Sequence, residues 1–463
     1  MREPLRVSPI PALAERARAL FRSEATRGLA FRREKLLKLK SVLEANEEKV
    51  FAALMADLGK PPQDAYLAEL GLVYEELKLA VKNLGSWMKP ERRGTPLVLW
   101  PASSARYPEP LGTVLIIAPW NYPFTLALDP LVGAIAAGCT VVLKPSEVST
   151  ATAAVLEDVC RQAFGDDGLV TVVQGGPEVS QALLAEKWDL VFFTGSTQVG
   201  QVVMEAAAKH LTPVVLELGG KSPCIVDEDT DLAVTARRIA WGKAYNAGQT
   251  CVAPDYVLVH RAVKQPFIDA MATALSELFG SDPMKSPDYG RIINARHFSR
   301  LMRLMPGGRV VVGGQTDEAS RFIAPTVLTD VELSHPLMQE EIFGPLLPVI
   351  EVPDLESAIR FVNQRPRPLA LYAFTRDDGK AEEILRRVSA GGAVVNDCII
   401  HFANTSLPFG GVGPSGMGAY HGKASFDTFT HYKSVMKKPF SLDIKLRYPP
   451  YKTPLSLFRR LVG

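Results

Sequence analysis

Cys251 is the residue whose type and setting best suit covalent chemistry. It ends a polar, glycine-containing turn, Asn246-Ala247-Gly248-Gln249-Thr250-Cys251, from which a thiolate could attack a carbonyl carbon. Glu217 stands between two leucines after Val214-Val215-Leu216 and could activate water, although a partnered structural carboxylate is the alternative. The thiol and the carboxylate together indicate acyl chemistry through sulfur. The remaining cysteines lie within or beside apolar patterns typical of a protein core: Cys139, Cys160, Cys224 and Cys398.

Two further polar residues could take part in the same chemistry. Asn121 lies just past a predicted strand, at the edge where open α/β sheets bind ligands, and its amide could donate to a developing oxyanion or simply cap the next helix. Glu341, which precedes a turn, is a second acid/base candidate, with a solvated acidic residue as the alternative. The histidines are scattered without HxxxH or Cys/His clusters, so no metal site is expected.

Two turns could bind a nucleotide. The segment Thr194-Gly195-Ser196-Thr197-Gln198-Val199-Gly200 follows an apolar strand and opens a helix, where free backbone amides attract phosphate. A purely structural turn is the alternative, because the segment is not GxGxxG. Lys144 and Glu147 follow the second strand of the unit, where a lysine and an acid can reach ribose hydroxyls.

Strands alternate with helices from residue 113 onward. Each strand is a near-continuous apolar run, which predicts a parallel sheet covered on both faces in a doubly wound α/β arrangement. Residues 10–88 have helical periodicity, residues 89–110 are predicted to form an extended arm, and a second α/β region should run from after residue 216 to about residue 412. The predicted strands are residues 113–117, 140–143, 169–173, 189–193, 214–216 and 256–259, and one intervening helix spans residues 150–164.

Composition fits an ordinary soluble globular protein. The 463 residues carry 52 Lys plus Arg against 50 Asp plus Glu, and the net charge of +2 gives no reason to expect a nucleic-acid partner. Five cysteines without a CxxC pair favour a reducing cytoplasm over a disulfide framework. The first residues lack an apolar signal core, and the apolar run 126–143 is broken by Asp129, Pro130 and two glycines, so no membrane-spanning segment is expected.

Seven motifs occur in an order that resembles the aldehyde dehydrogenase superfamily, most closely its class 3 branch of fatty and aromatic aldehyde dehydrogenases. The resemblance covers nearly the whole chain, from the N-terminal helices to about Lys438. The motifs are Pro-Trp-Asn-Tyr-Pro (119–123), Lys-Pro-Ser-Glu (144–147), Phe-Thr-Gly-Ser-Thr-Gln-Val-Gly (193–200), Leu-Glu-Leu-Gly-Gly-Lys (216–221), Gly-Gln-Thr-Cys (248–251), Glu-Ile-Phe-Gly-Pro (341–345) and Pro-Phe-Gly-Gly-Val-Gly (408–413).

The resemblance implies NAD(P)-dependent oxidation of an aldehyde to a carboxylic acid. Cys251 would form a thiohemiacetal whose oxygen is held by the Asn121 amide and the Cys251 N–H. Loss of hydride would leave a thioester, which water activated by Glu217 hydrolyses. In the class 3 branch, Glu341 is a further candidate for the catalytic acid/base.

By the same resemblance, the carboxylate of Glu147 should repel a 2′-phosphate, so NAD is expected as the preferred cofactor with NADP tolerated. The residues expected to bind the cofactor are Lys144 and Glu147 at the adenosine ribose, Gly195, Ser196, Thr197 and Gly200 at the diphosphate and nicotinamide side, and Glu341 with Phe343 at the nicotinamide ribose.

The resemblance also implies an interrupted architecture and a substrate class. A dinucleotide-binding domain would comprise residues 1–90 and 109–218, a catalytic domain residues 219–415, and a small β bridging and oligomerisation element residues 91–108 and 416–440. Because such an arm adds strand edges to another subunit, a homodimer is expected. A medium- or long-chain aliphatic or aromatic aldehyde would suit the apolar and aromatic residues expected in the pocket wall: Tyr122, Trp241, Tyr245, Phe402 and His421.

The chain ends without the long apolar helix or prenylated cysteine of membrane-attached relatives, which predicts a soluble enzyme. Residues 441–463 form a basic, Pro-rich tail that could contact an anionic membrane surface through Lys445, Arg447, Lys452, Arg459 and Arg460. A solvated end, or a segment packed across a dimer, is the alternative.

Two rival functions stay open at this point. A CoA-acylating relative would resolve the thioester with a thiol, against which Glu217 argues. A catalytically silent dinucleotide-binding protein would have no use for Cys251, Asn121 and Glu217 together.

Overall fold

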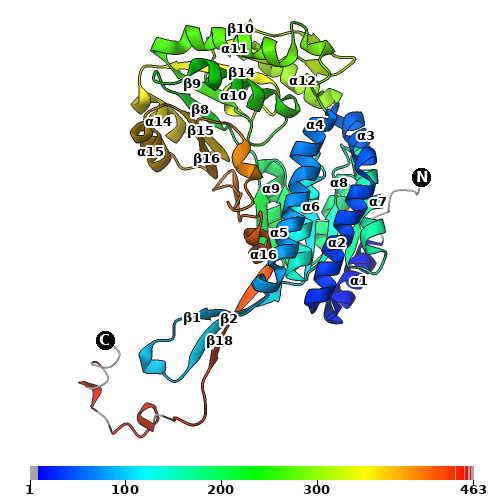
Figure 1. Ribbon diagram of the computed structural model, residues 1–463, viewed down its shortest axis with the longest axis vertical. Coiled ribbons are helices and arrows are strands. Elements are labelled where there is room, and N and C mark those ends of the chain that lie inside the picture. The colour runs from blue at the N-terminus through cyan, green and yellow to red at the C-terminus, as the bar shows by residue number, and fades with distance from the viewer. Residues whose placement is uncertain (1–8, 444, 453, 457–458, 460–463) are drawn as a thin grey trace.

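Two largely parallel sheets and an antiparallel arm organise the chain (Figure 1). The structure is a computed structural model that describes residues 9–443, 445–452, 454–456 and 459. Residues 1–8, where the sequence lacks a signal core, and Arg460 of the tail lie outside this described part.

The first sheet has six strands and is parallel except for its edge strand β17, which pairs antiparallel with β7. Its order is β17 (Gly416–Met417), β7 (Val214–Glu217), β6 (Leu190–Thr194), β3 (Thr113–Ile117), β4 (Thr140–Lys144) and β5 (Val170–Val172).

Helices cover both faces of this sheet, so its central strands are buried along their whole length. In β3, Leu115 and Ile117 join the core under one set of helices, whereas Val114 and Ile116 join the core under the other set. The first set is α1 (Ile10–Arg22), α8 (Pro177–Ala185) and α9 (Thr197–Ala208); the second is α2 (Leu29–Ala45), α5 (Gly71–Trp87), α6 (Thr125–Ala137) and α7 (Thr150–Phe164). This arrangement confirms the predicted doubly wound sheet.

The helical prediction for residues 10–88 is also confirmed. Between α2 and α5 the chain forms α3 (Glu47–Leu58), α4 (Pro62–Ala65) and a π-helical turn, η2 (Tyr66–Leu70). Four strands of the first sheet differ slightly from their predicted bounds: β5 is shorter than residues 169–173, β6 is shifted by one residue from 189–193, and β4 and β7 each extend one residue past 143 and 216.

The second sheet has seven strands, all parallel except β10, and helices pack on it as expected for a second α/β region. Its order is β10 (Arg309–Val312), β13 (Thr326–Thr329), β14 (Leu346–Val352), β9 (Tyr256–His260), β8 (Pro223–Val226), β15 (Ala370–Phe374) and β16 (Gly392–Val395). A two-stranded sheet, β11 (Thr316–Asp317) with β12 (Phe322–Ile323), lies apart from it. The helices of this region are α10 (Leu232–Ala244), α11 (Lys264–Phe279), α12 (Ala295–Leu304), α13 (Pro336–Gln339), α14 (Leu355–Asn363) and α15 (Asp378–Arg387).

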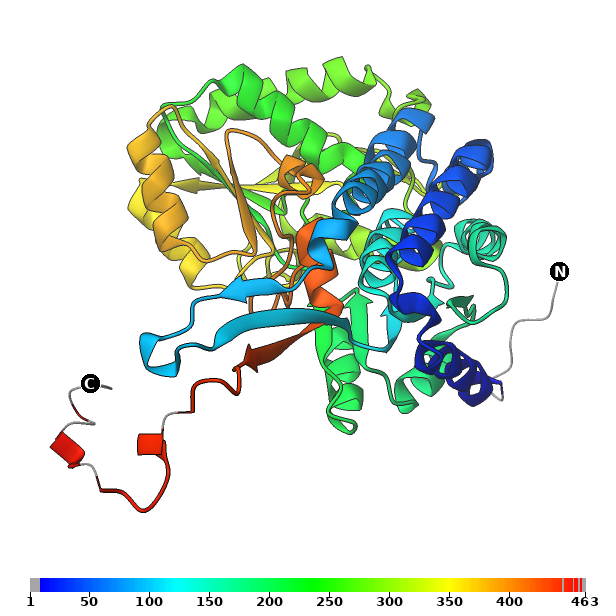
Figure 2. The same cartoon turned by 60° about the horizontal axis from the view of Figure 1, so that its bottom comes forward.

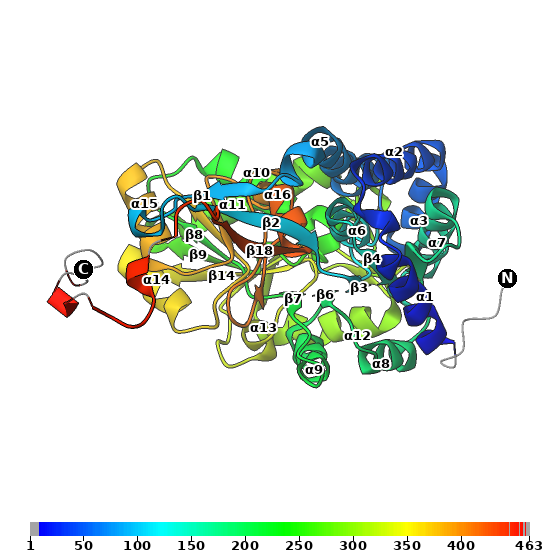
Figure 3. The same cartoon turned by 90° about the horizontal axis from the view of Figure 1, so that it is seen from below.

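The arm is a three-stranded antiparallel sheet of β1 (Glu91–Arg93), β2 (Ser103–Pro110) and β18 (Thr430–Lys437), and it projects from the body of the molecule (Figure 2). β18 pairs with β2 from Thr430 opposite Pro110 to Lys437 opposite Ser103. Seen from below, the arm crosses beneath the second sheet (Figure 3). Its tip leaves Leu97 and Trp100 exposed.

The segment 416–440, predicted to belong to the bridging element, is divided in the structure. β17 extends the six-stranded sheet, and α16 (Lys423–Thr428) packs on α6 and α5, so β18 alone joins the arm. Gly416 has φ 142°, and a Cβ there would lie 2.2 Å from the Leu216 carbonyl oxygen. Only glycine therefore allows this edge pairing.

Among the helices described, none is both long and apolar enough to span a lipid bilayer.

Candidate active site

The turn that carries Cys251 follows α10 and is held in an unusual backbone conformation. Asn246, Ala247 and Gly248, within the 3₁₀ segment η4 (Tyr245–Gly248), have φ values of 52°, 51° and 74°. A Cβ on Gly248 would lie 2.3 Å from the Gly344 carbonyl oxygen, so the glycine lets the turn approach the Glu-Ile-Phe-Gly-Pro segment closely. Strained backbone of this kind clusters at functional sites.

The side chain of Gln249 fixes this turn from within. Its Nε2 donates to the carbonyl oxygens of Asn246 and Arg291, both at 3.0 Å, and its Oε1 accepts from the Ile293 N–H at 2.9 Å. The amide is buried and its donors and acceptor are satisfied, which favours a single conformation of the turn.

Asn121 ties the first sheet to this turn. It is buried after β3, its Nδ2 donates to the Gln249 carbonyl at 3.0 Å, and its own carbonyl accepts from Asn246 Nδ2 at 2.9 Å. The structure thus brings Asn121 and the Cys251 turn together, as the sequence predicts.

A buried ion pair that the sequence analysis did not single out holds the backbone of Asn121 through a hydrogen bond. Lys60 Nζ lies 2.6 Å from Glu69 Oε1 and donates to the Asn121 carbonyl at 3.2 Å. Glu69 Oε2 accepts from the N–H groups of Phe124 and Thr125 at 3.0 Å, at the start of α6. The side chains of Lys60 and Glu69 are 1% and 0% exposed. Glu69 lies on the π-helical turn η2, and such turns occur frequently at functional sites.

Glu217 ends β7 and is 3% exposed. Neither of its carboxyl oxygens has a hydrogen-bond partner among the described residues. Burial raises the pKa of Glu217 well above its ordinary value. A purely structural, partnered carboxylate, the alternative left open by the sequence, does not match this environment.

The segment before Glu341 is anchored by a lysine and aspartate pair. Lys221 Nζ pairs with Asp255 and donates to the carbonyl oxygens of Leu337 at 2.8 Å and Glu340 at 2.9 Å. Asp255 Oδ1 accepts from the Ile342 N–H at 2.9 Å. Hydrogen bonds to the residues before and after Glu341 therefore fix the position of its backbone.

The Glu341 carboxyl lies against the glycines that follow β7. A Cβ on Gly219 would lie 1.8 Å from Glu341 Oε2, so only glycine leaves room for this carboxyl. Burial, reinforced by Asp255, raises the pKa of Glu341 to about 8, although a hydrogen bond from the Gly220 backbone opposes the shift. Oε1 has no hydrogen-bond partner among the described residues.

Cys251 itself is partly buried and follows the strained segment of the turn. Burial, followed by the charges of Glu341 and Glu217, raises the pKa of Cys251, whereas hydrogen bonds from the Val252 and Cys251 backbone lower it. The resting residue is a thiol, so its activation requires transfer of the proton to a nearby base. The other four cysteines are buried, as predicted for core residues.

The predicted ribose-binding pair lies at the end of β4. Lys144 is buried and its Nζ lies 2.5 Å from Glu147 Oε2, while the Glu147 side chain is 41% exposed. The exposed carboxylate can therefore accept hydrogen bonds from a ligand while its partner lysine stays fixed.

The predicted diphosphate turn opens α9. The Ser196 side chain caps this helix by accepting from the Val199 N–H at 3.4 Å. A Cβ on Gly195 would meet the Phe193 ring at 2.5 Å, and a Cβ on Gly200 would meet Leu218 at 2.6 Å. The lack of a Cβ at these two glycines allows the strand and the helix to pack closely.

A cavity of about 550 Å³ lies at the carboxyl end of the first sheet, lined in part by Thr197, Gly219 and Glu341. Its volume is in the range of small-molecule and cofactor sites. Lys144 and Glu147 do not line this cavity. Phe343 has φ 48° and meets the Trp120 ring edge-on at 5.3 Å.

Three of the predicted pocket-wall residues surround the Cys251 turn. The Tyr122 hydroxyl hydrogen-bonds with Thr250, and the rings of Trp241 and Tyr245 lie 5.2 Å apart. His421 stacks on Phe409 instead, and burial lowers the pKa of its imidazole to about 4. Phe402 is partly buried against the core.

The fold is α/β, and the candidate site lies at the carboxyl edge of the doubly wound sheet. It combines the Cys251 thiol, a possible nucleophile, with the carboxyl groups of Glu217 and Glu341, whose pKa values are raised. The model of the aldehyde dehydrogenase family matches residues 7–435. The chain belongs to the aldehyde dehydrogenase family, which confirms the resemblance seen in the seven motifs.

Relatives cover nearly the whole chain. The protein is 47% identical over 438 residues to the 4,4'-diaponeurosporen-aldehyde dehydrogenase of Staphylococcus aureus (strain NCTC 8325 / PS 47), covering 94% of this chain and 95% of the relative. It is 48% identical over 450 residues to the dimeric NADP-preferring aldehyde dehydrogenase of Canis lupus familiaris, covering 96% and 98%.

Solved structures give the same result. The substrate-bound Staphylococcus aureus AldH has a TM-score of 0.96 at 45% identity, covering 98% of this chain and 99% of that chain. An indole-3-acetaldehyde dehydrogenase in complex with NAD⁺ has a TM-score of 0.86 at 30% identity, covering 94% and 90%.

Proposed function

We propose that Cys251 carries the oxidation of an aldehyde to a carboxylic acid through a thioester. The protein is an NAD(P)-dependent aldehyde dehydrogenase. The observation that carries our assignment is the hydrogen bond from the buried Asn121 Nδ2 to the Gln249 carbonyl at 3.0 Å, because it brings an amide donor to the turn that carries Cys251.

The first step is proton transfer from the Cys251 thiol to the Glu341 carboxylate. The sulfur then forms a bond to the aldehyde carbon, and the carbonyl oxygen becomes an oxyanion. Asn121 Nδ2 and the Cys251 N–H stabilise this oxyanion, with Asn121 exchanging its bond to Gln249 for one to the substrate. When bound, the nicotinamide would supply the hydride acceptor that the conversion of the thiohemiacetal into a thioester requires.

Hydrolysis releases the acid. After Glu341 has released the thiol proton to solvent, a carboxylate takes a proton from water, the water oxygen bonds to the acyl carbon, and the carbon–sulfur bond breaks to regenerate Cys251. We assign Glu341 as the main base, because it lines the cavity, whereas Glu217 does not, and because its pKa of about 8 lies near working pH.

The residues present fit a dinucleotide. The cavity beside Thr197 and Gly219 has the size of a ligand site, and Glu341 Oε1, in its lining, has no hydrogen-bond partner within the described part of the chain. We assign Lys144 and Glu147 to the adenosine ribose, Gly195, Ser196, Thr197 and Gly200 to the diphosphate side, and Glu341 with Phe343 to the nicotinamide ribose. The exposed Glu147 carboxylate favours NAD over NADP by repelling a 2′-phosphate.

The substrate class follows from the side chains around the Cys251 turn. Tyr122, Trp241 and Tyr245 offer aromatic surface to a medium- or long-chain aliphatic or an aromatic aldehyde. The names of relatives that act on diaponeurosporenal and indole-3-acetaldehyde support a large apolar substrate.

We also propose a homodimer joined through the arm. Residues 91–108 supply β1 and most of β2, and the apolar side chains Leu97 and Trp100 are exposed at the tip. The dimeric relative supports this state. The cofactor domain would comprise residues 1–90 and 109–218, and the catalytic domain residues 219–415.

The five free cysteines support a reducing, cytoplasmic location. Basic residues of the tail, Lys445, Arg447, Lys452 and Arg459, would contact anionic lipid at the periphery of a membrane. Truncation after Asp443 should abolish co-sedimentation with anionic vesicles. Unchanged binding by the truncated protein would show that the tail does not contact the lipid.

The direct test of function is to mix the protein with NAD or NADP and a panel of aldehydes of increasing chain length, and to follow NADH or NADPH by absorbance. Free acid should accumulate even when CoA is present. Acyl-CoA as the main product, or no turnover by folded protein that binds cofactor, would contradict the proposal.

A further inference from the structure

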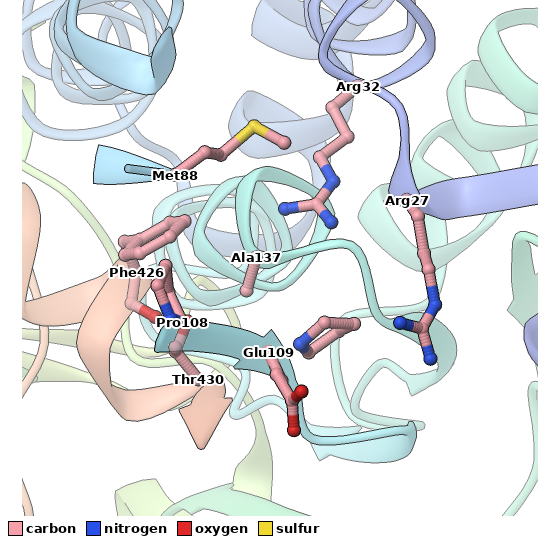
Figure 4. A pocket seen from close by; sticks show the side chains of 9 residues that line it. Arg27, Arg32, Met88, Pro108, Glu109, Ala137, Phe426 and Thr430 are labelled. Atoms are coloured by element: carbon pink, nitrogen blue, oxygen red, sulfur yellow. Dashed lines mark hydrogen bonds between the residues drawn. The ribbon is translucent and has the colours of Figure 1, made fainter. Parts of the chain in front are cut away.

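A polar cavity lies where the arm joins the body (Figure 4). It encloses about 180 Å³ and is lined by residues from the first sheet's helices and from β2 and β18. α6 separates it from the proposed active site, because this helix begins at Thr125, near Asn121, and ends at Ala137 in the cavity wall. None of the catalytic or cofactor residues assigned above lines this cavity.

Arg32 is the deepest cation of this cavity and is only 5% exposed. Its Nε donates to the Thr26 carbonyl at 2.8 Å and its Nη1 to the Ala136 carbonyl at 3.0 Å. A guanidinium has five N–H donors, so these two bonds leave three donors for another acceptor. In Figure 4 the guanidinium is turned into the cavity.

The charge of Arg32 has no acidic partner among the described residues. Burial, opposed by Cys139 and reinforced by the positive charge of Arg27, lowers the pKa of Arg32 to about 10. Buried charges in proteins are normally paired, because an isolated one loses its hydration without compensation. An anion in the cavity would supply the missing compensation.

The rest of the lining has a charged side and an apolar side. Arg27, half exposed, adds a second guanidinium (Figure 4). Glu109 is the one acid in the lining, and its carboxylate pairs with Lys433 on β18. Met88 and Phe426 supply an apolar wall.

We propose that this cavity binds a small carboxylate with an apolar substituent. The planar guanidinium of Arg32 matches both oxygens of a carboxylate in a two-point geometry, and Arg27, which also pairs with Glu24 at 3.5 Å, would add positive charge beside it. The wall of Met88 and Phe426 would receive the hydrocarbon part, which inorganic phosphate lacks. This assignment does not depend on the proposed reaction.

Binding would join two parts of the molecule. Arg27 and Arg32 belong to the N-terminal helices of the body, whereas Glu109 lies on β2 and Thr430 on β18 of the arm. A ligand held between them would stabilise the arm against the body, and the melting temperature should rise with ligand concentration.

The test is calorimetric titration of the full chain with hexanoate, with hexan-1-ol and inorganic phosphate as comparisons. Hexanoate should bind, and Arg27→Gln should weaken this binding about two- to fivefold while leaving aldehyde oxidation unchanged. Glu109→Gln should strengthen it by a similar factor, because it removes the one negative charge of the lining. Arg32→Lys keeps the positive charge but loses the planar two-point donor geometry, and should weaken hexanoate binding about tenfold or more.

Each alternative outcome decides against the proposal. Equal binding of hexan-1-ol would show an apolar cavity that does not use its arginines, and tighter binding of phosphate would make the ligand an inorganic oxyanion. Hexanoate affinity unaffected by both Arg27→Gln and Glu109→Gln would place its binding elsewhere, for example in the substrate pocket. Since Arg27 is half exposed, its variant keeps the test valid even if Arg32→Lys fails to fold.

Discussion

Replacing Lys60 by Met should slow aldehyde oxidation by displacing Asn121, although we assign Lys60 no contact with the reacting atoms. The Lys60 ammonium holds the Asn121 carbonyl at 3.2 Å and pairs with Glu69 at 2.6 Å. Its loss leaves the Glu69 carboxylate in the core without a cation, while one of the two hydrogen bonds to the Asn121 carbonyl, from Asn246, remains.

The size of the effect follows from the partners that survive. Removing one partner of a buried ion pair costs about 3 to 5 kcal/mol. Glu69 keeps two backbone N–H donors at the start of α6, so the lower figure of about 3 kcal/mol applies. For a chain of 463 residues this corresponds to a fall in melting temperature of about 3 °C. A shifted but still present oxyanion donor should cost about tenfold in kcat, less than the 10²- to 10³-fold of a deleted one.

The assay is steady-state NADH formation together with thermal unfolding, on Lys60→Met and on a matched control. Lys78→Met removes the same side chain from an exposed pair with Glu75, at 3.1 Å, and should change stability by less than about 0.5 kcal/mol and leave kcat unchanged. The KM for NAD should stay constant in both variants. A Lys60→Met enzyme with wild-type kcat would refute the positioning role, whatever its stability.

Three further predictions concern the site. Because the pKa of Glu341 is raised to about 8, its base form is scarce below that pH and kcat should rise from pH 7 to about pH 9; Glu341→Gln should remove this limb of the profile. Glu147→Gln should raise kcat/KM with NADP relative to NAD about fivefold, measured by initial rates with both cofactors, and an unchanged ratio would dissociate Glu147 from cofactor choice. Gly248→Ala should lose more stability than Gly165→Ala in thermal denaturation, since both positions have positive φ but a Cβ is blocked at Gly248 alone; equal losses would show that the contact with the Gly344 carbonyl does not constrain the turn.

Periodicity was sufficient for the regular parts of the fold. Apolar runs such as residues 113–117 form buried strands in the structure. A parallel sheet covered on both faces requires apolar side chains at every strand position. α7 spans Thr150–Phe164, as the sequence predicts. Cys251 stood out from the other cysteines because its neighbours are polar, and it is the one that lies in the turn beside the carboxyl groups.

Local sequence patterns did not predict contacts between residues that are distant along the chain. Lys60 and Glu69 are ordinary charged residues in a helical stretch, and nothing in their neighbours reveals that both are buried behind Asn121. The pairing of β17 with β7 depends on Gly416, whose φ of 142° is visible only in three dimensions. Gly195 and Gly200 suggested room for a cofactor, whereas the structure adds a packing reason for each.

The arginine cavity illustrates the same limit. Arg32 sits in a highly charged helix, where exposure is the ordinary expectation, yet it is buried against the end of α6. The environment of its side chain is set by β2, α16 and β18, which come from the middle and the end of the chain.

The central claim is that Cys251 carries the acyl group, and intact-mass spectrometry after acid quenching tests it most directly. Wild-type protein that is mixed with NAD and aldehyde and quenched in acid within its first turnover should gain the mass of up to one acyl group per chain. The gain should map to the peptide that contains Cys251 and be absent from the Cys251→Ser variant. Continued oxidation of aldehyde without any such adduct, or by the Cys251→Ser protein, would contradict the account.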